Sequence, residues 1–109
     1  MKDIKKILFL LDGSDYAIES AEFTLSLARS LESSVIAINI IDPVIVQQMV
    51  RFQDKSQGEV EIELEENGWK YLYYFEEMAL EKKVKSFIQL EIGNIPDRVI
   101  LFSKKYKTD

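Results

Sequence analysis

Two residue types that carry out much of protein chemistry are missing from this 109-residue chain. It contains no histidine, which is the usual general base near neutral pH and the commonest ligand of transition metals. It contains no cysteine, so neither a disulfide framework nor a thiolate can form, and we expect the reducing cytoplasm as its compartment. The composition therefore predicts a protein that is not an enzyme, with no catalytic residue and no metal site.

Long apolar runs and an excess of positive charge are also absent. No run approaches the roughly 20 residues of a membrane-spanning helix, and Met1 leads straight into a strand-like segment without a signal peptide. The net charge of −5 opposes nucleic-acid binding, which depends on cations that neutralise phosphates. We expect neither a membrane nor a nucleic acid as a partner. With 47% hydrophobic and 30% charged residues, positions 1–109 suit a single globular domain.

What is present is an alternation of strand-like and helix-like patterns. Residues 4–11 contain a nearly unbroken apolar run at positions 7–11, and residues 35–41 form a second one; such runs are typical of strands that are buried on both faces. Residues 15–31 between them have one apolar stripe at helical spacing. Residues 84–92 alternate apolar and polar side chains, as an edge strand does. Pro96 suits the first position of a last helix.

The segment between the second and third strands is harder to assign. Residues 44–57 combine helical spacing with a loop-like end, and both interpretations stay open. Residues 59–83 have helical spacing, but Gly68 costs about 1 kcal/mol relative to alanine, which predicts a bend or break there. The whole order is β-α-β-α-β-α. We therefore expect an α/β three-layer sandwich whose parallel sheet is joined by crossover helices.

Three segments, in the right order, resemble the universal stress protein family. They are Lys6-Ile7-Leu8 leading to Asp12-Gly13-Ser14, Val35 to Asp42-Pro43, and Gly93-Asn94-Ile95-Pro96. The resemblance implies the adenine nucleotide alpha hydrolase-like fold, with five parallel strands in the order 3-2-1-4-5. Only strands 3-2-1 have counterparts here, so we expect one domain over residues 1–109 that lacks strands 4 and 5, incomplete at its C-terminus.

The resemblance also implies a nucleotide site beyond the carboxyl ends of the strands, beside strand 1. Asp12 matches the family's aspartate near the ribose, the triphosphate and the metal, within the turn that Gly13 and Ser14 complete. Ile40 matches the position whose backbone recognises adenine, whereas Leu10 stands where ATP-binding members often have proline. Without the resemblance, Asp12 is an ordinary turn residue and Ser14 is a helix cap.

The family's phosphate loop has no counterpart in these residues. That loop, Gly-x-x-Gly followed later by Gly-Ser or Gly-Thr, needs glycines so that backbone N–H groups can approach phosphate, and no glycine follows Gly93. We therefore expect a universal stress protein-like stress-response protein that acts by self-association and partner binding, without a cofactor and with only weak affinity for ATP or AMP. The alternative is an ATP-binding protein that uses Asp12 and magnesium, with its phosphate site completed by another chain.

The first strand predicts the mode of self-association. In the family's order it lies between strands 2 and 4, so without strand 4 one backbone edge of residues 7–11 is open. We expect a homodimer in which this strand pairs antiparallel with its own copy. Five aromatic residues within positions 69–75 cover more than one side of a helix, and both core packing and a protein interface are open interpretations for them. The glutamates of residues 59–66 predict a solvated helix start rather than a cation site.

Overall fold

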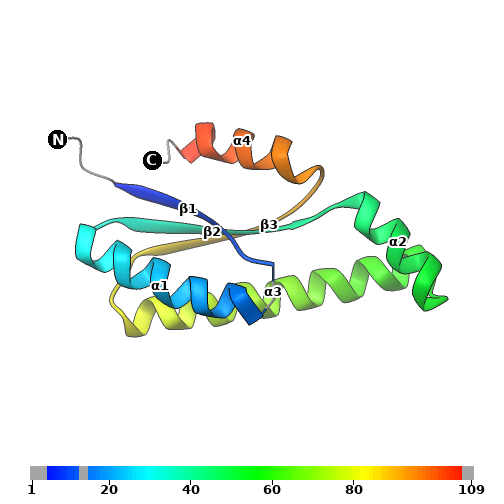
Figure 1. Cartoon of the computed structure of the whole chain (residues 1–109), viewed down its shortest axis with the longest axis horizontal. Helices are drawn as coiled ribbons and strands as arrows, with labels where there is room; N and C mark the ends of the chain where they lie inside the picture. Colours follow the sequence, from blue (N-terminus) through cyan, green and yellow to red (C-terminus); the bar gives the residue numbers. More distant parts are fainter. Residues whose placement is uncertain (1–4, 13–14, 107–109) are drawn as a thin grey trace.

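The computed structural model describes residues 5–12 and 15–106. Along this part of the chain the elements are β1 (Lys6–Leu10), α1 (Asp15–Leu31), β2 (Ser34–Ile41), α2 (Pro43–Gln53), α3 (Gln57–Glu81), β3 (Ser86–Ile92) and α4 (Ile95–Tyr106) (Figure 1). The ambiguous residues 44–57 thus belong mainly to a separate helix, α2, and α4 begins one residue before Pro96. None of the described helices is both long and apolar enough to cross a membrane.

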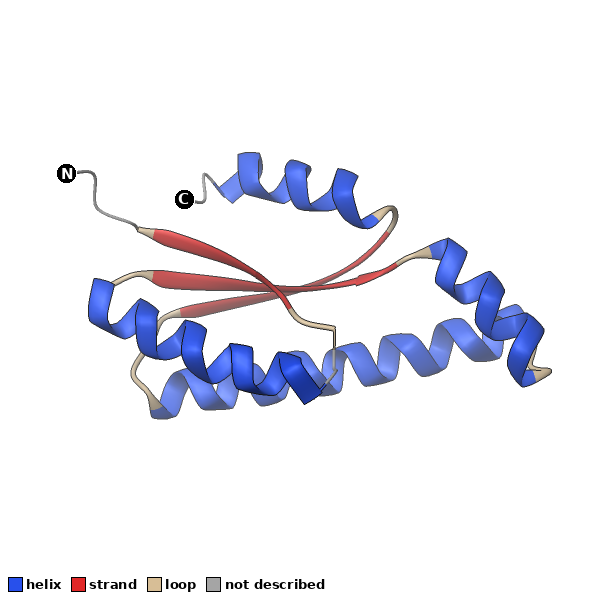
Figure 2. Ribbon diagram, in the orientation of Figure 1, coloured by secondary structure: helices blue, strands red, loops and turns tan. Residues whose placement is uncertain are grey.

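The three strands form one parallel sheet in the order β1-β2-β3, which confirms the predicted order 3-2-1 and places β3 at an edge. Figure 2 shows α1 and α3 on one side of the sheet and α4 on the other. This arrangement confirms the predicted three-layer α/β architecture. It follows from the connections, because a right-handed crossover from β1 to β2 and on to β3 leaves its helices on the same face.

The central strand β2 is buried on both faces, as its unbroken apolar run predicts. Val35 and Ala37 pack under α1 and α3, while Ile36 and Ile38 pack with Phe102 of α4. The same prediction is wrong for β1, where residues 7–9 are only half-buried and residue 10 is 41% exposed. The physical reason is position: β1 has β2 on one side and no described strand on the other.

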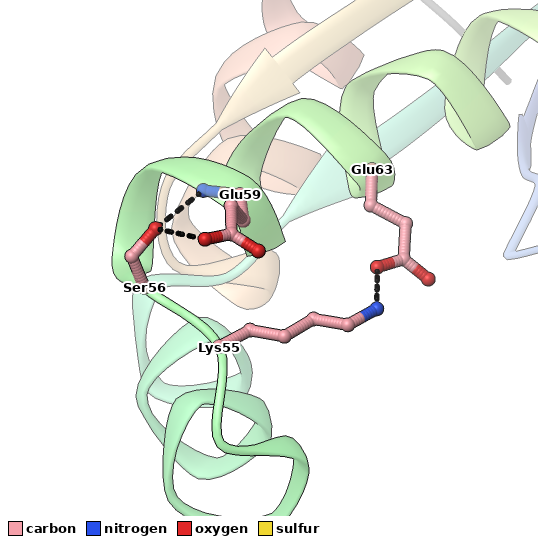
Figure 3. Close-up of polar contacts among 4 residues, drawn as sticks. All are labelled: Lys55, Ser56, Glu59 and Glu63. Carbon is pink, nitrogen blue, oxygen red and sulfur yellow. Dashed lines mark hydrogen bonds and ion pairs between the residues drawn. The ribbon is translucent and has the colours of Figure 1, made fainter.

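Polar caps fix the turn that joins α2 to α3. Ser56 accepts a hydrogen bond from the Glu59 N–H at 3.2 Å, and its hydroxyl donates to the Glu59 carboxylate, also at 3.2 Å (Figure 3). The Ser-x-x-Glu spacing is that of a capping box, but here the carboxylate accepts from the Ser56 hydroxyl and not from the Ser56 N–H. Beside it, the Lys55 Nζ lies 2.9 Å from Oε2 of Glu63 (Figure 3). This hydrogen bond and the attraction to the Glu63 carboxylate raise the pKa of Lys55 above its ordinary value.

Helix α3 continues through Gly68, so the break that this glycine predicted does not occur. Gly68 is buried, and a Cβ atom added to it would lie 2.5 Å from Cδ1 of Leu90 and 2.8 Å from Oδ1 of Asn39. The glycine therefore allows α3 to lie close against the ends of β2 and β3. Its role is close packing, and the helix that it permits forms one wall of the cavity described next.

Candidate functional site

A cavity of about 230 Å³ lies where β1 and β2 end, beside α3. Asp12 and Ile40, two of the four predicted site residues, both line it, so the structure brings them together. The other two, Gly13 and Ser14, lie outside the described residues, as does the predicted cap by Ser14. Helix α3 supplies the largest share of the remaining wall, through Asn67, Gly68 and Tyr71 among others, and α2 and α4 contribute Ile45 and Ile95.

The backbone of Ile40 lies beyond the end of the β1–β2 ladder. The last residue pair is Leu10 with Ile38, and the Ile38 carbonyl points toward β1, because it accepts from the Leu11 N–H at 2.9 Å. Alternate residues of a strand direct their backbone groups to the same side. The N–H and C=O of Ile40 therefore also point to that side, where the ladder has ended, and offer one donor and one acceptor to the cavity.

Asn39 holds the two strand ends in place. Its side chain is buried, and its Nδ2 donates to the Leu11 carbonyl at 2.8 Å, one step past the last pair of the ladder. The amide thus replaces a ladder hydrogen bond just before Asp12. Sequence reasoning missed this residue, although a signal existed: Asn39 is the polar position in the otherwise apolar run of residues 35–41.

The charge of the cavity wall is negative. Asp12 and Asp42 both line it, and no lysine or arginine is found among its described lining residues. The Asp42 carboxylate also caps α2, where Oδ1 accepts from the Val44 N–H at 2.9 Å. Among residues 5–12 and 15–106, no group of three or more carboxylates is arranged to hold a metal ion. The wall as described suits a neutral heterocycle better than a bare phosphate group, which carries the same sign of charge.

No family model matches the chain. A universal stress protein of Methanocaldococcus jannaschii is 30% identical to it over 106 residues, which make up 96% of this chain and 61% of that protein. The chain therefore spans about three fifths of the length of this curated relative.

Solved structures of universal stress proteins have the same fold. A protein of this family from Burkholderia pseudomallei superposes with a TM-score of 0.81 at 16% identity, covering 99% of this chain and 79% of that one. A universal stress protein in complex with cAMP superposes with a TM-score of 0.69 at 14% identity, covering 99% and 70%. At these identities the structural likeness concerns the fold alone, and it confirms the predicted fold class.

Proposed function

We propose that this chain, whose sequence and fold are similar to those of universal stress proteins, is a member of that family and a stress-response protein that acts by self-association and binding rather than by turnover. The observation that supports this proposal most directly is the open edge of β1. The proposed compartment is the cytoplasm, because the chain has no cysteine. The proposed partner at the open edge is a second copy of the chain.

The free side of β1 has unpaired backbone groups next to apolar side chains. Leu11 directs its N–H to β2, so alternation turns the N–H and C=O of Leu8 and Leu10 away from β2. No described strand lies on that side. Leu8 and Leu10 also line a small apolar hollow of about 60 Å³ together with Val99 of α4. An apolar strand edge of this kind favours pairing with another strand.

Helix α1 extends the apolar surface beside this edge. Ile18 lines the groove between α1 and α3, whereas Leu27 and Leu31, at 42% and 40% exposure, and Phe23, at 70%, do not line it. Each hydrogen bond between strands contributes only about 0.5–1.5 kcal/mol net. Burial of these side chains against a second copy would supply the larger share. A two-fold axis at β1 would give one continuous six-stranded sheet.

The dimer can be tested with a proline at an outward-facing position. Leu10→Pro removes an N–H that points away from β2, so the β1–β2 ladder is kept while pairing with a partner is blocked. Leu10→Ala is the matched control, because it shortens the same side chain and keeps the N–H. In sedimentation velocity at micromolar concentration we expect a dimer for the wild type and for Leu10→Ala, and a folded monomer for Leu10→Pro. A well-folded wild-type monomer under these conditions would contradict the proposal.

The second candidate function is binding of an adenine nucleotide. It is favoured by the Ile40 backbone, because a donor and an acceptor side by side can match one edge of a planar base and fix its orientation. A structurally similar universal stress protein is in complex with cAMP, which is also an adenine nucleotide. The cavity, at about 230 Å³, is smaller than the roughly 300–1,000 Å³ of ordinary small-molecule sites. Base and ribose therefore fit the described cavity better than a triphosphate does.

Calorimetric titration tests nucleotide binding and distinguishes its two possible modes. If the cavity recognises base and ribose, adenosine and AMP bind at least as tightly as ATP, with or without magnesium. If instead Asp12 and magnesium hold the triphosphate and another chain completes its site, ATP binds in the micromolar range only with magnesium. In that case Asp12→Ala abolishes binding. The absence of heat with all three ligands would contradict nucleotide binding and leave self-association as the proposed function.

A further inference from the structure

Helix α3 has a second apolar surface, on the side that faces away from the sheet. We call it the outer stripe of α3: Ile62, Trp69, Tyr73 and Leu80, which are 58%, 37%, 55% and 71% exposed. The rings of Trp69 and Tyr73 stack on each other, with centroids 5.7 Å apart. These positions are spaced by seven, four and seven residues, so they follow one line along the helix. Figure 2 shows α3 as one long helix below the sheet.

The outer stripe is not part of the protein's own core. The opposite side of α3 supplies the buried residues Val60, Leu72, Phe75 and Ala79, and Phe75 stacks on Phe9 of β1 with ring centroids 5.6 Å apart. The aromatic segment 69–75 is therefore divided between two sides of the helix: Phe75 belongs to the core, and the interface interpretation stays a prediction for Trp69 and Tyr73. A surface helix of a globular protein needs only one apolar side. The second side indicates a surface for a partner.

Charge disfavours a second copy of α3 as the partner. The helix has eight glutamates and one lysine, a larger excess of negative charge than the −5 of the whole chain. Glu66 and Glu76 interrupt the outer stripe itself. In an antiparallel pair of α3 helices Glu66 would lie opposite Glu76, and in a parallel pair each would lie opposite its own copy. Like charges in direct apposition are destabilising, so the complementary partner is cationic.

A groove runs along one flank of the outer stripe. Its volume is about 530 Å³, and it lies between α1 and α3 with Ala21, Phe75 and Met78 among its lining residues. Tyr73 belongs both to the groove and to the outer stripe. A helix that lies on the stripe could therefore place one large side chain in the groove. Apolar anchors of this kind, at helical spacing, are the usual basis of recognition between a helix and a groove.

We propose that the outer stripe of α3 binds a basic amphipathic helix of a protein partner. The apolar residues of that helix lie on the stripe, one large side chain enters the groove beside Tyr73, and its lysines or arginines pair with Glu66 and Glu76. The apolar contacts supply the affinity, and the charges set the register and select a cationic partner. This binding does not depend on the β1 dimer, because the two surfaces share no residue.

Trp69, the single tryptophan of the chain, makes the proposal directly measurable. The probe is a tryptophan-free peptide of leucine and lysine, about 18 residues long, with leucines at helical spacing. We expect its addition to shift the Trp69 emission to shorter wavelength as the indole is buried, with binding that weakens as salt is raised. A peptide of identical composition whose leucines are scrambled around the helix is the control for simple charge attraction, and it should bind at least about tenfold more weakly.

Paired substitutions test the surface on the protein side. The double substitution Glu66→Lys and Glu76→Lys should weaken peptide binding about tenfold or more. The control is the same charge change at two exposed glutamates away from the stripe, Glu19 in α1 and Glu32 just after α1, which should change the affinity less than about threefold. Leu80→Ser should also weaken binding. Its control is Phe52→Ser on α2, because Phe52 is 88% exposed and lies outside the stripe.

Three results would overturn the proposal. The first is equal affinity for the scrambled peptide, which would mean attraction by net charge alone. The second is an equal loss of affinity in the two charge-reversed pairs, and the third is a change in the sedimenting mass of the free protein caused by Leu80→Ser, which would assign the stripe to a second copy. Leu10→Pro should leave peptide affinity unchanged, so failure of the dimer proposal and failure of this one are distinguishable.

Discussion

Replacement of Gly68 by alanine sets two effects of known size against each other. Within a helix alanine is favoured over glycine by about 1 kcal/mol, so α3 alone would gain stability from the change. The added Cβ, however, would lie 2.5 Å from Cδ1 of Leu90 and 2.8 Å from Oδ1 of Asn39. Both distances are well inside van der Waals contact, so at least one neighbour must move.

The two neighbours differ in how easily they can move. Leu90 is only half-buried and can rotate its methyl groups, which reduces its share of the cost. Asn39 is buried and is held by its hydrogen bond to the Leu11 carbonyl, so its displacement would strain or break that bond. Overpacking costs about 1–3 kcal/mol, and an unsatisfied buried polar group costs about 1–3 kcal/mol. After the gain of about 1 kcal/mol in helix propensity, we expect Gly68→Ala to lower the free energy of unfolding by about 1–5 kcal/mol, toward the lower end because Leu90 can move.

Urea unfolding measured by circular dichroism tests this expectation, with Gly58→Ala as the matched control. Gly58 is also in α3, but a Cβ there would meet nothing within 4 Å, so the same substitution should be neutral or stabilise by up to about 1 kcal/mol. An urea midpoint for Gly68→Ala equal to or above that of the wild type would refute the reasoning. It would mean that α3 can move off the sheet at little cost.

Two further predictions concern the hydrogen bonds from Asn39 to Leu11 and from Lys55 to Glu63. Asn39→Ala should lower the free energy of unfolding by about 1–3 kcal/mol, because it leaves the Leu11 carbonyl without its donor, and a change below 0.5 kcal/mol in urea unfolding would argue against that role. Glu63→Gln should lower the pKa of Lys55 toward its ordinary 10.5, as followed by NMR titration. Because the pKa of Lys55 is raised in the folded protein, the contact with Glu63 stabilises the fold at pH values below the ordinary pKa of lysine. This contribution is lost as the pH rises through the folded-state pKa. An unchanged Lys55 pKa in Glu63→Gln would contradict the role given to Glu63.

Local patterns in the sequence predicted the order of elements, whereas Asp12 and Ile40 were named from the family resemblance, and the structure brings these two residues to one cavity. Strand runs, turn residues and the helical stripe depend on neighbours in the chain, and the positions of Asp12 and Ile40 follow from the ends of strands in a parallel sheet. Gly68 was misjudged because helix propensity says nothing about how closely a helix approaches a sheet. The burial of β1 was overestimated for a related reason: burial of a strand depends on which strands lie beside it.

The roles of Asn39 and of the outer stripe of α3 could not be predicted from the sequence for the same reason. Within an apolar strand, one asparagine looks like an interruption until the end of the neighbouring strand is known to need a donor. Within a helix that also has a core side, Trp69 and Tyr73 cannot be assigned to core or surface before the sheet is placed. Both assignments depend on contacts between elements that are distant in the sequence.

The strand order β1-β2-β3 is also the order in which a ribosome makes the strands. Each new strand joins the edge left by the one before it, so no formed pair has to open to admit a later strand, and the sheet can grow during synthesis. The free edge of β1 is then the oldest surface of the sheet and stays uncovered while the later elements are made. Lys5 and Lys6 place charge at its start, where they oppose edge pairing, whereas its carboxyl half is apolar. If the proposed pairing of β1 occurs, contact between nascent chains would begin at Leu8 and Leu10, before α4 exists.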